Sequence, residues 1–147
     1  GKAPRNARVI KGDSLFVIPG LIDAHMHLFQ SGGLYTRPDA IDLRQFQPYA
    51  TERAWLRSNT EDLLKRYLQL GITTVVDMGG PLYQLQRRDT LAGATGLPNL
   101  LITGPLVSTY LPAALDVPDA PIVKVSSAAE AVALVAAAPR GAGDGVF

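Results

Sequence analysis

From Leu21 onward, strand-like and helix-like segments alternate along the chain, and this alternation limits the fold more than any other feature. Runs of apolar and β-branched residues predict strands at residues 21–25, 72–77, 100–102 and 145–147. Helical spacing of apolar residues predicts helices at residues 59–70, 82–91 and 126–138. Strands separated by helices lie parallel in one sheet, joined by right-handed crossovers. The predicted class is therefore α/β, either a doubly wound sheet or a barrel.

The segment from Gln30 to Asn59 contains turn-forming residues and is predicted to be a long loop. Asn59 is predicted to cap the helix that follows it, because asparagine is a common capping residue and the acidic residues Glu61 and Asp62 lie in the first turn. Gly71 is predicted to end that helix.

The amino-terminal residues have a different pattern. Arg8–Ile18 consists of two short apolar runs around a turn cluster at residues 11–14, which predicts a two-stranded unit. Pro19 and Gly20 separate this unit from the alternating part of the chain.

Composition excludes several classes of function. The 147 residues carry a formal net charge of +1, and the basic residues are scattered, so nucleic acid is not an expected partner. No apolar stretch is long enough to span a membrane, so a membrane is not an expected partner either. The chain contains no cysteine, so any bound metal must have nitrogen and oxygen ligands.

The chain has two histidines, His25 and His27, at the end of the first predicted strand of the alternating part. Residues two apart in a strand point to the same face, so the two imidazoles are expected to project together. Paired imidazoles are good ligands for first-row metals, and active sites lie at the carboxyl ends of strands in parallel α/β barrels. The alternative interpretation is a surface pair or a hydrogen-bonded core pair.

The sequence around this pair, Pro19-Gly20-Leu21-Ile22-Asp23-Ala24-His25-Met26-His27, resembles the strand-one signature of the amidohydrolase superfamily. Residues 71–79 and 100–105 more loosely resemble the second and third barrel strands of these enzymes, and residues 12–18 resemble a strand of their small β-sandwich. The similarity is greatest to the branch with imidazolonepropionases and prolidase-like dipeptidases.

The resemblance implies that residues 20–147 form the first half of a TIM barrel, about four βα units, and that residues 1–19 are terminal strands of a β-sandwich. It implies one or two Zn²⁺ ions, with His25 and His27 as ligands, and hydrolysis of an amide, cyclic amide or related C–N bond, or of an ester or lactone. The remaining ligands and the general-base aspartate are expected outside this chain, and the chain is expected to be cut at both ends. Lys124 precedes a predicted helix that the bridging lysine of the family follows, so it is rejected for that role.

Four other residues are candidates for supporting roles. Asp23 is expected to orient a histidine or to be a buried, hydrogen-bonded carboxylate. Asp77 ends the second strand and is expected to contact a ligand or a metal-binding residue, or else to cap a helix. Tyr35 and Arg37 lie in the long loop, where Arg37 would bind a substrate carboxylate, or both would be solvated.

Three hypotheses about function follow. The first is a metal-dependent hydrolase of a small molecule, partnered by the remaining half of the barrel or by copies of itself. The second is a non-catalytic fragment or pseudoenzyme, because two ligands are too few for a closed site. The third is a doubly wound binding domain with incidental histidines.

Overall fold

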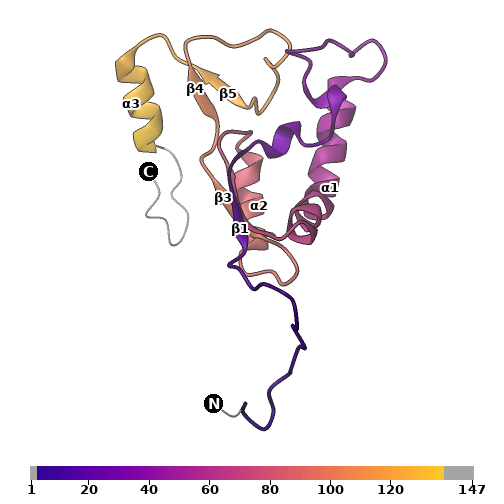
Figure 1. Cartoon of the computed structure of the whole chain (residues 1–147). Coiled ribbons are helices and arrows are strands. Elements are labelled where there is room, and N and C mark those ends of the chain that lie inside the picture. Colours follow the sequence, from indigo (N-terminus) through magenta and orange to yellow (C-terminus); the bar gives the residue numbers. More distant parts are fainter. Residues whose placement is uncertain (1–2, 138–147) are drawn as a thin grey trace.

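Three parallel strands form the centre of the fold in a computed structural model that describes residues 3–137. β1 (Leu21–Met26), β2 (Ile72–Asp77) and β3 (Asn99–Ile102) lie side by side in chain order. The helix α1 (Tyr49–Gln69) joins β1 to β2, and α2 (Tyr83–Leu91) joins β2 to β3 (Figure 1). The predicted α/β class with parallel strands is confirmed.

The core lies between this sheet and its helices. Met26, Leu28, Leu64 and Val75 form one buried cluster, which brings together the end of β1, the middle of β2 and the inner face of α1. Burial of one such side chain stabilises a fold by roughly 1.5–3 kcal/mol. Because Met26 belongs to this cluster, the carboxyl end of β1 is fixed against the body of the protein.

The helix α1 begins ten residues before the predicted start, so Tyr49–Ser58 is helix and not loop. Its buried face includes the polar residues Glu52 and Thr60, and this interrupts the apolar periodicity that predicts a helix. The predicted cap, Asn59, lies inside the helix and its amide donates to the carbonyl of Trp55. Gly71 follows the helix with φ of +82°, the conformation of a glycine that ends a helix.

The rest of the predicted loop contains two short 3-10 helices, η1 (Leu28–Gln30) and η2 (Leu34–Thr36). After β3, two strands that were not predicted, β4 (Leu106–Ser108) and β5 (Ile122–Lys124), pair in parallel as a separate sheet. The last described element is α3 (Ala128–Ala137), which confirms the helix predicted there. The fourth predicted strand, at residues 145–147, lies outside the described residues.

The two short strands predicted within Arg8–Ile18 are absent, because residues 3–20 contain neither helix nor strand. This segment extends away from the sheet in Figure 1. Phe16 and Val17 are 97% and 98% exposed, so no neighbouring strand covers them. A two-stranded ribbon has little stability without a surface on which to pack, which accounts for the difference. Assignment of these residues to a β-sandwich stays a prediction.

Within residues 3–137, no helix is both long enough and apolar enough to cross a lipid bilayer.

Candidate metal centre

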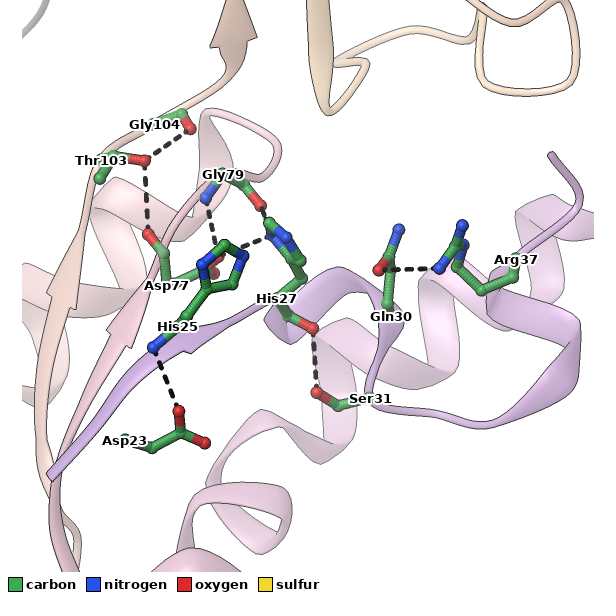
Figure 2. Close-up of polar contacts among 10 residues, drawn as sticks. All are labelled: Asp23, His25, His27, Gln30, Ser31, Arg37, Asp77, Gly79, Thr103 and Gly104. Atoms are coloured by element: carbon green, nitrogen blue, oxygen red, sulfur yellow. Dashed lines mark hydrogen bonds and ion pairs between the residues drawn. The ribbon is translucent and has the colours of Figure 1, made fainter. Parts of the chain in front are cut away.

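The two histidine rings lie together at the carboxyl end of β1 (Figure 2). Their centroids are 5.3 Å apart and their planes are almost perpendicular, at 89°. His27 follows the strand with extended backbone, φ −133° and ψ 105°, so the alternation of side chains continues past Met26. Met26 points into the core, and the two imidazoles project together as predicted.

One ring nitrogen of His27 has a defined partner. Its Nδ1 lies 3.0 Å from the carbonyl oxygen of Gly79, in the turn after β2. A carbonyl oxygen only accepts hydrogen bonds, so the neutral ring carries its proton on Nδ1. The lone pair of Nε2 is then free, which is the arrangement of a histidine that ligates a metal through one nitrogen and donates from the other.

Asp77 lies at the end of β2 with its side chain fully buried. Its Oδ1 is 4.0 Å from Nδ1 of His27 and accepts a hydrogen bond from the N–H of Gly79 at 3.3 Å. Burial raises the pKa of Asp77 to about 7, and hydrogen bonds from the N–H groups of Gly79 and Leu28 act in the opposite direction. The carboxyl group therefore supports the backbone near His27 and is not open to a ligand.

Asp23 holds the backbone of His25. Its Oδ1 accepts a hydrogen bond from the N–H of His25 at 3.1 Å, and the residue is half-buried. The contact reaches the main chain and not the imidazole ring. Asp23 therefore supports the backbone that carries His25 but does not orient its imidazole ring. It is also not a fully buried carboxylate.

Tyr35 and Arg37 lie in and just after η2, and the structure shows no contact between either residue and the two histidines. The guanidinium of Arg37 makes two hydrogen bonds to the carboxylate of Asp39, at 3.1 and 3.0 Å. This ion pair raises the pKa of Arg37, chiefly through the hydrogen bond. Its Nη1 also donates to Gln30 at 3.4 Å, so Arg37 is not free to bind a carboxylate without exchanging partners.

Two contributors to the site were missed in the sequence. The carbonyl of Gly79 holds His27, and a backbone carbonyl has no signature among residue types. Gln84 lies on the buried face of α2, beside Asp77, and is 2% exposed. With its amide oriented so that both ends are satisfied, its nitrogen donates to Oδ2 of Asp77 at 2.8 Å and its oxygen accepts from the N–H of Phe29 at 3.2 Å. A glutamine in a helix is usually exposed to solvent, so its residue type carries no signal of this buried role.

The donor chemistry of the pair fits a divalent transition metal. Imidazole nitrogen suits Zn²⁺, Nε2 of His27 is free of hydrogen bonds to the described residues, and the centroid of its ring lies 5.3 Å from that of the exposed His25. Among residues 3–137, no group of three or more histidine, cysteine or acidic side chains is placed to hold a metal ion. The described residues thus bring together two candidate nitrogen ligands but do not form a complete coordination shell.

Comparison with models of protein families and with curated proteins found no match. Among solved structures, the chain is similar to a crystal structure described as that of an amidohydrolase, with 23% sequence identity and a TM-score of 0.50 over 78% of this chain. A second crystal structure, of an uncharacterised protein, has 24% identity and a TM-score of 0.41 over 62% of this chain and 20% of the other. That TM-score is too low to support an argument about the fold.

The matched region makes up 28% of the length of the first solved structure. At this identity the similarity concerns the fold alone. The arrangement of parallel strands and helices in this chain is like that of part of an amidohydrolase structure.

Proposed function

We propose that this chain forms part of the active site of a metal-dependent hydrolase of the amidohydrolase superfamily, with His25 and His27 as metal ligands. The observation that carries the proposal is the pairing of two imidazoles at a strand end, with Nδ1 of His27 held by the Gly79 carbonyl and Nε2 left free. Zn²⁺ is the first candidate metal. The motif around the histidines and the similarity in fold to an amidohydrolase support the same proposal.

The strand order is that expected of the first strands of a TIM barrel. β1, β2 and β3 are adjacent in chain order, as successive strands of a barrel are. β1 and β3 are both edge strands among the described residues, and each pairs with β2 alone. In the proposed barrel, further strands pair with these edges, and an aspartate from outside the described residues is the general base.

When bound, the metal would activate water and polarise the scissile carbonyl. His25 and His27 would hold the metal, while the buried side chains of Met26 and Leu28 anchor the intervening backbone to the core. His25 is the more exposed of the two, so substrate would approach from its side. The proposed substrate contains an amide, cyclic amide or related C–N bond, of the kind handled by the imidazolonepropionase and prolidase-like branch, with esters and lactones as the alternative. Arg37 would bind a substrate carboxylate only by exchanging Asp39 for it.

Metal content tests the proposal directly. Plasma mass spectrometry of the purified protein should find about one zinc ion per chain, and a His25→Ala, His27→Ala variant should lose this zinc. A Gln45→Ala, Gln86→Ala variant, changed at two exposed positions, is the matched control and should keep the metal. Equal metal in both variants would show that the histidines are not the ligands.

A second candidate function is a non-catalytic protein that keeps the fold. It is favoured by the lack of a third ligand among residues 3–137, since two ligands do not make a closed tight site. Folded protein without metal, and without hydrolysis of amide, cyclic amide, ester and lactone substrates when zinc is added, would favour this candidate over the enzyme.

A further inference from the structure

Asp77 joins the turn after β2 to the segment after β1. Its Oδ1 accepts a hydrogen bond from the N–H of Gly79, and the N–H of Leu28 also donates to this carboxyl group. Leu28 is next to His27 in the chain, and the carbonyl of Gly79 holds the ring of His27. One buried carboxyl group therefore fixes both the backbone that carries the His27 ring and the backbone that the ring contacts.

Gln84 holds the other side of the same carboxyl group. Its amide nitrogen donates to Oδ2 of Asp77, and its amide oxygen accepts from the N–H of Phe29, two residues after His27. The contacts form a closed circuit from His27 through Gly79, Asp77 and Gln84 to Phe29 and back. Both Asp77 and Gln84 are buried, so water does not compete for these hydrogen bonds.

The turn after β2 has no room for a side chain at either glycine. A Cβ on Gly79 would collide with the side chain of Leu106, and φ of Gly79 is +148°, which L-residues rarely adopt. A Cβ on Gly80 would collide with the amide of Gln84. The turn therefore requires glycine at these positions, and in this conformation the carbonyl of Gly79 points at Nδ1 of His27 (Figure 2).

We propose that Asp77 is a positioning residue that, clamped by Gln84 and acting through the Gly79 carbonyl, fixes His27 as the Nδ1-protonated tautomer and presents Nε2 as the ligand atom. The benefit to metal binding rests on the proposed function, but the tautomer does not. The ring nitrogens of His25 make no hydrogen bond within residues 3–137. His25 therefore provides an internal comparison for a ring whose tautomer the protein does not fix.

The test is long-range nitrogen–proton NMR correlation of the two imidazoles in the metal-free protein, at a pH at which both rings are neutral. In the unaltered protein, His27 should show the Nδ1-protonated pattern and His25 the Nε2-protonated pattern that neutral imidazole favours in water. In Asp77→Ala, His27 should shift toward the pattern of His25, and His25 should not change. An Nε2-protonated His27 in the unaltered protein, or no change in Asp77→Ala, would overturn the proposal.

Asp77→Asn separates geometry from charge. An asparagine oxygen still accepts from the N–H of Gly79, so this variant should keep His27 Nδ1-protonated. Loss of the Nδ1-protonated pattern in Asp77→Asn would show instead that the charge of Asp77 acts directly on the ring across the 4.0 Å gap. If Asp77→Ala does not fold by circular dichroism, Gln84→Met decides: a partial shift of His27 supports the clamp, and an unchanged His27 overturns it.

Zinc affinity provides the second readout. Loss of a group that orients a metal-binding histidine typically lowers affinity roughly 10–100-fold, and this is the change expected in Asp77→Ala. If the tautomer responds to Asp77 but no protein binds zinc, the proposed function fails and the positioning role stands. If zinc binds equally to both proteins and the tautomer is unchanged, the positioning role fails and the metal site stands.

Discussion

Oδ1 of Asp77 and Nδ1 of His27 lie 4.0 Å apart, too far for a direct hydrogen bond. Each atom is instead satisfied by the backbone of Gly79, the carboxyl oxygen by its N–H and the ring nitrogen by its carbonyl. A single residue in a tight turn thus connects a buried acid to a candidate metal ligand. The buried acid has consequences for stability that do not depend on any metal.

Stability of the metal-free protein should fall as the pH rises from about 4 to about 7. The unfolded chain loses the Asp77 proton near the ordinary pKa of 3.8, whereas the folded protein keeps it until about 7. Between these values the folded state binds more protons, so raising the pH favours unfolding. At about 1.4 kcal/mol per pKa unit, the loss amounts to about 4 kcal/mol at most.

Urea unfolding at several pH values measures this effect, with Asp77→Asn as the control. Asparagine does not titrate, so the variant should lack this part of the pH dependence. Stability that rises over the same window in the unaltered protein, relative to the variant, would mean that Asp77 is ionised in the folded state and stabilised by its donors.

A proline at position 54 should break α1. Ala54 lies in the first half of the helix and is exposed, so the substitution removes a helical hydrogen bond without disturbing the core. The expected cost is about 3 kcal/mol or more, against about 1 kcal/mol for the control Ala54→Gly. Loss of ellipticity and a lower urea midpoint measure it. A proline that costs no more than glycine would mean that the helix begins after residue 54.

The early start of α1 shows where sequence reasoning reaches its limit. β2 was predicted with its observed bounds, and α2 and β3 within one residue of theirs, because apolar side chains mark these elements. In α1, the polar residue Glu52 occupies a buried position in a segment predicted to be loop, and Gln47 donates to its carboxylate at 2.7 Å. Residue types do not reveal which polar side chains find such partners in the folded state.

In the candidate site, too, some features were predictable from the sequence and others were not. His25 and His27 were predictable from their spacing at a strand end, since strand alternation is a local property. The circuit behind them was not, because it depends on a backbone carbonyl and on Gln84, which lies 57 positions after His27 in the chain. β4 and β5 were missed for another reason, since three-residue strands carry too little pattern to detect.

Leu64→Ala should destabilise the fold strongly. The side chain of Leu64 is fully buried between α1 and the sheet, in the cluster that contains Met26. Removal of such a leucine costs about 2–5 kcal/mol, because transfer energy is lost and a cavity remains. The control is Leu70→Ala, at a position that is 72% exposed, where a change within about 0.5 kcal/mol is expected. Similar urea midpoints for the two variants would contradict the packing of α1 against the sheet.

Asp119 should stabilise the start of α2 from the loop between β4 and β5. Its Oδ1 accepts from the N–H of Leu82 at 2.8 Å, and its Oδ2 accepts from Arg57 of α1 at 3.0 Å. An acceptor at a helix start contributes about 0.5–2 kcal/mol, and an exposed ion pair adds at most about 1 kcal/mol. Asp119→Ala should therefore lower the free energy of unfolding by about 1–2 kcal/mol, which urea denaturation can measure.

Asp119→Asn isolates the cap from the ion pair. Asparagine keeps an oxygen for Leu82 and tolerates the positive φ of +54° at this position, so it should retain most of the stability and lose only the pairing with Arg57. Amide hydrogen exchange at Leu82 should accelerate in the alanine variant but not in the asparagine variant, because only alanine removes the acceptor. Equal losses in the two variants would show that the charge, and not the hydrogen bond to Leu82, is what Asp119 contributes.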